Sequence, residues 1–189
     1  MSKEQLTQLQ EKYKTFTYDQ RYGPFISDEV AELEKKANCQ RYVRDAIHAS
    51  FGVLIPSTYL SKEIFEYQQG LFLPIEFGDE QFGDIFLLGR PSDTLDVRSL
   101  HLTFFEGEYH DDNKNNPLLR HFHGNAKTKG LKYYPLSVFQ DAIHAKDYGM
   151  LYGIRRIVPE NISKISIEEL NSVAEVETYD WNKLNGDER

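Results

Sequence analysis

The chain has a single cysteine, Cys39, among its 189 residues. One thiol cannot form an intramolecular disulfide, so a disulfide-stapled fold is excluded. No apolar stretch approaches the ~20 residues that span a bilayer, and the polar N-terminus MSKEQLTQLQEKYK lacks the apolar segment of a standard secretory signal. These absences predict a reducing, cytoplasmic setting with no membrane partner, although export by a specialised machine would leave the same sequence.

Basic residues are also in the minority. The chain has 22 Lys and Arg against 30 Asp and Glu, a net charge of −8. Such a surface repels phosphate backbones, and no run of Lys or Arg offsets it, so nucleic acid is not an expected partner. The length and the 13% aromatic content suit one folded domain. We expect that domain over residues 1–160 and a C-terminal extension, packed or loose, over residues 161–189.

Helical periodicity dominates the first third of the chain. Apolar residues recur at helical spacing over residues 3–15, and Ser27 precedes two acids that suit a helix start. Asn38 is a good N-cap type for a helix that begins at Cys39 and ends near Gly52. A further helix is expected over residues 57–69.

After residue 70 the pattern changes to short apolar or alternating segments bounded by turn-forming residues, which is typical of strands. We expect these strands over residues 85–88, 100–105, 118–124 and 150–158, with a short helix over residues 135–145. Helices first and strands afterwards predict an α+β fold in which N-terminal helices pack on an antiparallel sheet.

The only thiol lies where it can be activated. Free N–H groups and the positive end of the helix dipole lower the pKa of a cysteine in the first turn of a helix. A nearby imidazole can take the thiol proton and remain as a stabilising cation. Taken alone, Cys39 is also typical of a small buried side chain, so the histidines decide between the two interpretations.

Histidines recur on two of the expected strands. Because side chains alternate along a strand, His101 shares a face with Thr103 and Phe105, while the intervening positions are wholly apolar and suit the core. His121 and His123 share one face of the next strand. Either of them can hydrogen-bond the ring nitrogen of His101 that does not face the thiol, which is the role of the third member of a catalytic triad.

Four short motifs occur in an order that matches a known family: NCQRYV, GDIFLL, HLTFFEG and FHG. In this order they resemble the NlpC-type papain-like cysteine peptidases of bacterial cell-wall turnover, over about residues 20–157. The related CHAP amidases share the order of Cys and His and rank second. The resemblance implies a papain-like α+β fold, no metal or organic cofactor, and hydrolysis of an amide bond, with a peptidoglycan-type peptide as the family's usual substrate.

Carried over residue by residue, the resemblance makes Cys39 the nucleophile, His101 the base and His123 the orienting group. His121 is the alternative third member. Tyr22 matches an upstream tyrosine that lines the site and helps to bind the oxyanion. The family's Asp before the cysteine and Ser after it are Asn38 and Gln40 here, which puts recognition of a peptide's free amine in doubt. Deamidation or acyl transfer to another acceptor would use the same triad.

Two other interpretations of this group of residues remain. His101, His121 and His123, with Cys39, are residue types that suit a zinc site. A non-catalytic binding module could keep the same fold and carry an ordinary thiol. His48, His110 and His144 are expected at the surface, outside any site.

Overall fold

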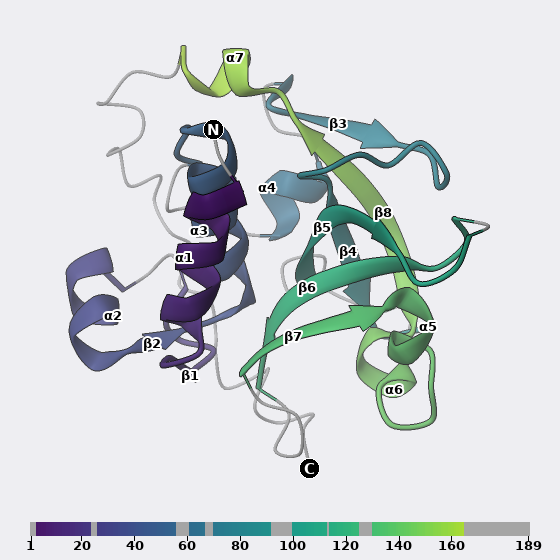
Figure 1. Ribbon diagram of the computed structural model, residues 1–189, viewed down its shortest axis with the longest axis horizontal. Coiled ribbons are helices and arrows are strands. Elements are labelled where there is room, and N and C mark those ends of the chain that lie inside the picture. Colours follow the sequence, from purple (N-terminus) through teal and green to yellow (C-terminus); the bar gives the residue numbers. More distant parts are fainter. Residues whose placement is uncertain are drawn as a thin grey trace.

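A six-stranded antiparallel sheet forms the centre of the computed structural model, which describes residues 3–23, 26–55, 61–66, 70–91, 100–112, 114–124 and 130–164 (Figure 1). The strands lie in the order β3-β8-β4-β5-β6-β7. Their bounds are β3 Phe72–Ile75, β4 Ile85–Gly89, β5 His101–Tyr109, β6 Pro117–His123, β7 Gly130–Pro135 and β8 Met150–Ile157. A parallel pair, β1 Thr17–Tyr18 and β2 Lys36–Ala37, forms a second, two-stranded sheet.

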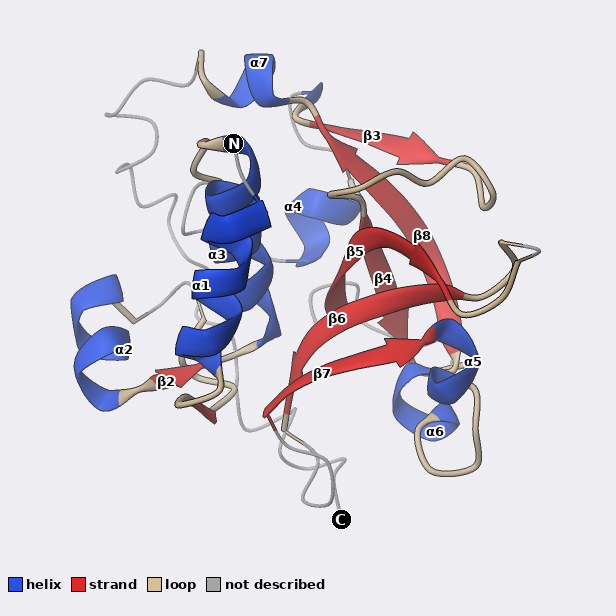
Figure 2. Cartoon of the chain, in the orientation of Figure 1, coloured by secondary structure: helices blue, strands red, loops and turns tan. Residues whose placement is uncertain are grey.

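Helices cover the sheet from two directions (Figure 2). Three N-terminal helices gather to one side of the strands: α1 Lys3–Tyr13, α2 Asp28–Glu34 and α3 Cys39–Phe51. The remaining helices are short: α4 Ser61–Phe65, α5 Leu136–Phe139, α6 Ala145–Tyr148 and α7 Pro159–Ile162. Helix α3 contacts both α1 and the strands β5 and β6, so it is the element that joins the helical layer to the sheet.

The ends of α3 follow from its sequence. The Asn38 side chain accepts a hydrogen bond from the backbone N–H of Arg41, which satisfies one of the free donors of the first turn. Gly52 ends the helix in the left-handed conformation at φ 71°, where a side chain would be strained. The apolar face between these ends packs on the sheet.

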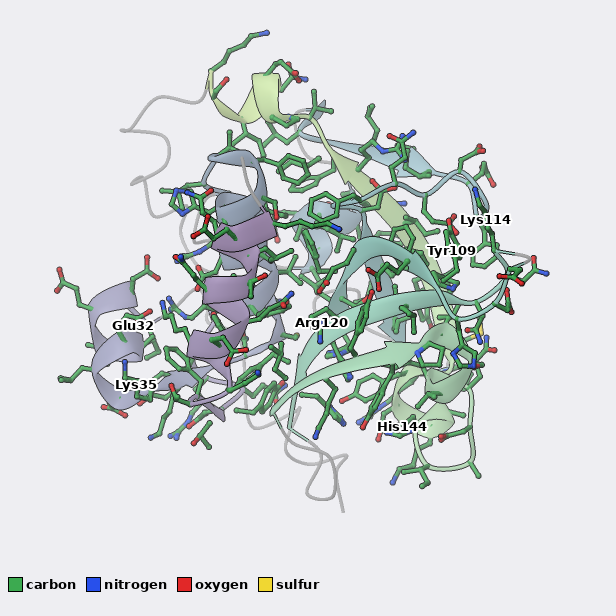
Figure 3. The ribbon with its side chains drawn as sticks, in the orientation of Figure 1. Glu32, Lys35, Tyr109, Lys114, Arg120 and His144 are labelled. Atoms are coloured by element: carbon green, nitrogen blue, oxygen red, sulfur yellow. The ribbon has the colours of Figure 1, made fainter. Side chains whose placement is uncertain are left out.

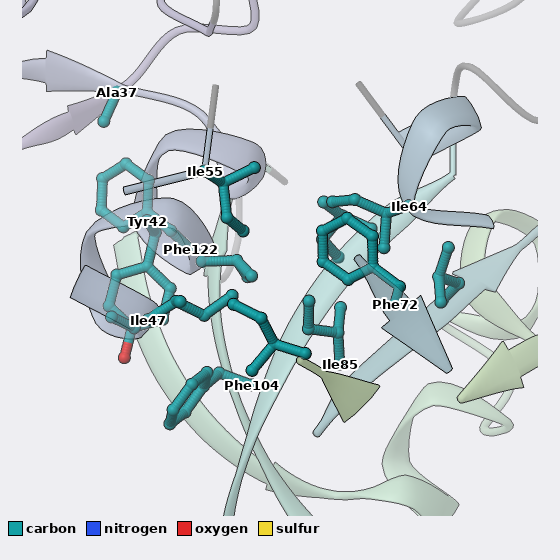
Figure 4. Packing of buried hydrophobic residues seen from close by; sticks show 14 of the residues in the cluster. Ala37, Tyr42, Ile47, Ile55, Ile64, Phe72, Ile85, Phe104 and Phe122 are labelled. Carbon is teal, nitrogen blue, oxygen red and sulfur yellow. The ribbon is translucent and has the colours of Figure 1, made fainter. Parts of the chain in front are cut away.

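Two apolar clusters lie on the two faces of β5. The first contains Tyr42 and Ile47 of α3 together with Leu102, Phe104 and Phe122 of the strands (Figure 4). The second contains alternate strand residues and the short helix α5: Phe86, Leu88, Phe105, Leu119, Leu136, Phe139 and Ile154. Both faces of this part of the sheet are therefore buried, although the sequence favoured an apolar face and a polar one.

The structure confirms the α+β fold with N-terminal helices packed on an antiparallel sheet. The four expected strands are present within one or two residues, except that β5 continues to Tyr109. The expected helix over residues 135–145 is wrong in detail, because α5 and α6 are two separate turns of helix, and strands β3 and β7 were not predicted. Of the expected helix over 57–69, the described part is helical over Ser61–Phe65. Residues 165–189 of the expected extension lie outside the described residues.

No helix in the described part of the chain has the length and apolar character that crossing a bilayer requires.

An ion pair between buried Asp84 and partly exposed Arg156 ties β8 to the turn before β4. Asp84 is 1% exposed and accepts hydrogen bonds from Arg156 Nε and Nη2 at 2.9 and 2.7 Å. Its Oδ2 also accepts the backbone N–H of Gln81 at 2.7 Å, so Asp84 caps the turn before β4. Two neighbouring strands of the sheet are thereby fixed at one end.

We expect Asp84→Ala to lower the free energy of unfolding by about 2 kcal/mol, because it removes two acceptors of the Arg156 guanidinium, which keeps its bond to the Asp79 carbonyl, and leaves the Gln81 N–H without its acceptor. Urea denaturation of wild type and variant measures the difference. Asp112→Ala, at an exposed position, is the control and should change stability by less than about 0.5 kcal/mol. An equal, small effect of both substitutions would contradict a stabilising role for this pair.

Candidate functional site

Cys39 is the first residue of α3, as the sequence predicted. The side chain of Asn38 is fully occupied there, because its oxygen caps Arg41 and its Nδ2 donates to the Gln20 carbonyl at 3.2 Å. Asn38 therefore shapes the helix start and binds it to the preceding loop. Its amide group is not free to meet a substrate.

The Cys39 side chain is buried, with 7% of the residue exposed. Burial raises the pKa of the Cys39 thiol to about 11, while backbone hydrogen bonds from Leu102, Gln40 and Cys39 itself act in the opposite direction. The contact with Leu102 places the sulfur against the peptide group that follows His101. The resting side chain is thus a neutral thiol that contacts the backbone N–H of Leu102, the residue that follows the expected base His101.

His101 and His121 form a buried pair. His101 Nε2 and His121 Nδ1 are 2.9 Å apart and share one hydrogen bond. The two residues are 5% and 0% exposed, and burial lowers the pKa of each imidazole well below its ordinary value. Both rings are neutral near neutral pH, so one ring donates and the other accepts.

His123 lies beside this pair with a different partner. Its Nδ1 shares a hydrogen bond with the Tyr148 hydroxyl at 3.1 Å. Its ring stacks on that of His121 with centroids 5.2 Å apart, and its centroid is 6.0 Å from that of His101. Burial lowers the pKa of His123 to about 4, with a smaller contribution from the nearby His144. The expected strand-face arrangement of the three histidines is confirmed, and the one that bonds His101 is His121.

The thiol and the imidazoles lie toward different faces of β5. Leu102 packs in the cluster with α3, whereas the ring of His101 contacts Phe139 and Tyr148 on the other face. Among the described residues, no hydrogen bond joins Cys39 to an imidazole. The structure therefore brings the three expected histidines together and leaves the thiol beside their strand without a bond to them.

Tyr22 lies in the loop that packs on the start of α3. Its hydroxyl donates to Glu34 Oε2 at 2.5 Å, and this hydrogen bond is the main cause that raises the pKa of the phenol. Arg41 is buried in α3, forms an ion pair with Asp28 and donates to the carbonyls of Tyr22 and Gly23 at 2.9 and 2.8 Å. A Cβ at Gly23 would lie 2.4 Å from the Asn38 amide, so this loop packs closely on the helix start.

His144 was expected at the surface, and this prediction is wrong. It is 4% exposed and lies beside α5 and α6 (Figure 3). Its ring centroid is 6.2 Å from that of His123, and its Nδ1 is 2.9 Å from Asp141 Oδ1. Sequence reasoning missed it because it falls in an irregular turn with no strand or helix period. We call His101, His121, His123 and His144 the histidine cluster.

The exposed positions of His48 and His110 agree with the sequence prediction. A zinc site made of His101, His121, His123 and Cys39 is not supported, because no group of three or more His, Cys, Asp or Glu side chains in the described part of the chain is arranged to hold a metal ion.

No family model matches the chain, and no curated protein matches it. Among solved structures, the chain is similar to a protein from Staphylococcus aureus described as similar to lipoprotein, NLP/P60 family. The identity is 12%, the TM-score is 0.48, and the alignment covers 84% of this chain and 43% of that one. A likeness of this degree says nothing about activity or substrate.

The first prediction from this geometry concerns the thiol. With a pKa of about 11, folded Cys39 should react with iodoacetamide at about pH 8 at least about 100-fold more slowly than the same thiol in the chain unfolded in urea. Intact mass measures the reaction with time. A folded thiol that reacts faster than the unfolded one, with an apparent pKa below ~8.5, would contradict the neutral buried state.

The second prediction concerns the imidazoles. His101, His121 and His123 have folded pKa values below their unfolded value, so the unfolded chain binds more protons in acid. Their contribution is fully present above pH ~6.5 and is lost as pH falls toward the folded values, at up to about 1.4 kcal/mol per pH unit for each histidine. Urea denaturation between about pH 7.5 and 5 measures this slope.

His123→Gln should reduce the slope of stability against pH by up to about 1.4 kcal/mol per pH unit, the effect of one proton, because His123 has a folded pKa of about 4. His48→Gln replaces an exposed histidine and is the matched control, which should keep the wild-type slope. A wild-type stability that stays constant over this pH window would contradict the buried, neutral cluster.

Proposed function

We propose that the chain is a cysteine hydrolase that cleaves an amide bond by acyl transfer, with Cys39 as nucleophile and His101 as base. One observation carries the proposal. The Cys39 sulfur lies against the peptide that follows His101, and the His101 ring is already hydrogen-bonded to a second imidazole. A thiol at a helix start and an oriented imidazole on the adjoining strand are the parts that thiol acyl transfer requires.

The proposed base is the Nδ1 atom of His101. If His101 Nε2–H donates to His121 Nδ1, the other ring nitrogen of His101 carries a lone pair. In the described part of the chain this Nδ1 makes no hydrogen bond. The His101 ring must turn toward Cys39 for the reaction, and its position as the first residue of β5 places the turning ring at the end of the strand. In this proposal His121 sets the tautomer of His101 before the ring turns, because the turn breaks their hydrogen bond, and His123 is the alternative partner.

The reaction begins with a neutral pair. Burial raises the thiol pKa and lowers the imidazole pKa, so an ion pair is disfavoured at rest. Cys39 Sγ forms a bond to the substrate carbonyl carbon while its proton moves to His101 Nδ1. The oxyanion that forms is stabilised by the backbone N–H groups at the start of α3, including those of Cys39 and Gln40 that contact the thiol at rest.

Collapse of this intermediate breaks the carbon–nitrogen bond, and His101 returns the proton to the leaving amine. A water molecule then attacks the thioester, giving its proton to His101, which passes it to the departing thiolate. The acid product leaves and the neutral thiol is restored. No oxidant, metal or organic cofactor takes part in this sequence.

The proposed substrate is a peptide-like amide. A peptidoglycan-type peptide follows from the resemblance to NlpC-type peptidases, in which the residues flanking the cysteine help to recognise a free amine. Here Asn38 uses both ends of its side-chain amide within the protein, so an amine of the substrate would need another partner. Deamidation of a protein side chain uses the same steps and belongs to the same proposal.

A second candidate is a non-catalytic binding module on the same fold. It is favoured by the raised pKa of Cys39 and by the lack of a hydrogen bond between Cys39 and an imidazole among the described residues. This candidate predicts that the reactivity of Cys39 does not depend on His101.

Acetylation by p-nitrophenyl acetate separates the two candidates without a known substrate. We expect wild type to form an acetyl adduct on Cys39 at about pH 7.5, located by intact mass and peptide mapping. His101→Gln should slow the adduct by about 100-fold, the usual contribution of a general base. His48→Gln, on the exposed side of α3, is the matched control and should acetylate at the wild-type rate.

Equal rates of Cys39 acetylation in wild type and His101→Gln would contradict the proposed hydrolase and favour the binding module. Near-UV circular dichroism of each variant checks that the buried substitution has kept the fold. His121→Gln and His123→Gln, compared in the same assay, decide which of the two orients His101. The larger loss is expected for His121→Gln, because His121 makes the hydrogen bond.

A further inference from the structure

The segment that holds α5 and α6 supplies ring contacts and hydrogen bonds to the histidine cluster. Phe139 packs on the ring of His121 at 4.9 Å between centroids, and Tyr148 packs on that of His101 at 4.6 Å. His144 and Tyr148 also face His123. None of these contacts comes from the motifs that define the proposed triad.

Asp141 determines which nitrogen of His144 carries the proton. Its Oδ1 accepts the backbone N–H groups of Ile143 and His144 at 2.8 and 2.9 Å and lies 2.9 Å from His144 Nδ1. These hydrogen bonds lower the pKa of the Asp141 carboxyl, so it is ionised and acts as an acceptor alone. His144 therefore donates through Nδ1–H, and neutral His144 keeps a lone pair on Nε2.

Tyr148 acts in the same way on His123. Its hydroxyl lies 3.1 Å from His123 Nδ1, and a phenol is a good donor to the lone pair of a neutral imidazole. With Nδ1 as acceptor, His123 carries its proton on Nε2. The hydroxyl and the ring of Tyr148 thus contact two different histidines, His123 and His101.

Three buried imidazole nitrogens support this assignment. The Nε2 atoms of His121, His123 and His144 are buried and have no hydrogen-bond partner in the described part of the chain. The three residues are 0%, 1% and 4% exposed. In the tautomers derived above, His123 Nε2 is a donor and His144 Nε2 an acceptor, on rings whose centroids are 6.2 Å apart. A donor and an acceptor on neighbouring rings are complementary rather than repulsive.

We propose that Tyr148, and His144 together with Asp141, are positioning residues that fix the proton positions of the histidine cluster around the resting His101–His121 pair. The proposal rests on the hydrolase function for its catalytic consequence. Tyr148 sets the tautomer of His123 and covers the ring of His101, while Asp141 sets that of His144. Asp147, the residue before Tyr148, forms an ion pair with Arg90 at 3.6 Å that ties α6 to the end of β4.

Imidazole nitrogen-15 spectra of the wild-type protein test the proton positions directly. At about pH 7.5 we expect His123 as the Nε2–H tautomer and His144 with a proton on Nδ1. Assignment uses His→Gln variants one at a time. Finding His123 protonated on Nδ1, or His144 on Nε2, overturns the proposal.

Tyr148→Phe tests the positioning role, because it keeps the ring and removes the hydroxyl. We expect His123 to become a mixture of tautomers and the acetylation rate of Cys39 to fall about tenfold or more. Tyr133→Phe removes a β7 hydroxyl that donates to Glu108 of β5; it is the matched control and should change neither. An unchanged His123 spectrum in Tyr148→Phe overturns the proposal.

The spectra also separate the failure of this proposal from that of the proposed function. If wild-type Cys39 shows no acetylation that depends on His101, the hydrolase fails, while the tautomers of His123 and His144 still support or overturn the positioning role. If acetylation depends on His101 and the tautomers are reversed, the hydrolase stands and the positioning role fails.

Discussion

The removal of four imidazoles from water is the constraint on which the rest of this site depends. A neutral imidazole has one donor and one acceptor, and once it is buried each must be met by another protein group or by water. One hydrogen bond between His101 and His121, one from Tyr148 at His123 and one to Asp141 at His144 meet one nitrogen of each ring, while Nε2 of His121, His123 and His144 has no partner in the described part of the chain. The segment with α5 and α6 therefore has a polar role in addition to its apolar packing, because without it two of the four rings would lose a partner.

Burial also gives Cys39 a raised pKa, whereas an activated catalytic thiol usually has a lowered one. A cysteine at a helix start is expected to have a low pKa, yet desolvation outweighs the local donors at Cys39. The positive end of α3 and the nearby N–H groups favour the thiolate, but these groups act within an environment that disfavours any charge. An acyl transfer from this state would couple proton loss to attack on the carbonyl, as in enzymes whose nucleophile is a neutral hydroxyl.

Much of the fold could be predicted from the sequence because its signals are local. Asn38 and Gly52 mark the ends of α3, and the alternation in HLTFF and HFH places the histidines on one face of β5 and β6. The strands β3 and β7 were missed because their segments contain proline, lysine and tyrosine without a clear alternation. Their formation depends on partners far along the chain, β8 and β6, which supply the hydrogen bonds that the local sequence does not indicate.

The candidate site was harder to predict, since it depends on which element covers each face. Sequence indicated the group Cys39, His101, His121 and His123, but it could not show that the side chain of His101 would turn toward Tyr148 and away from α3. His144 gave no signal, because its burial follows from a turn that Asp141 closes by three hydrogen bonds. Positions of this kind are fixed by tertiary packing, which a single-sequence pattern does not contain.

The close fit of the loop at Gly23 on Asn38, with Arg41 holding the two neighbouring carbonyls, has a consequence for molecular recognition. This loop, which packs on the start of α3, is ordered when the chain folds, so its conformational entropy is lost before any ligand binds. A ligand that docks there would not have to order the loop, so its affinity would depend on matching a preformed contour. Selectivity on this side of the thiol would then arise from shape, and a poorly matched ligand would be rejected by steric exclusion.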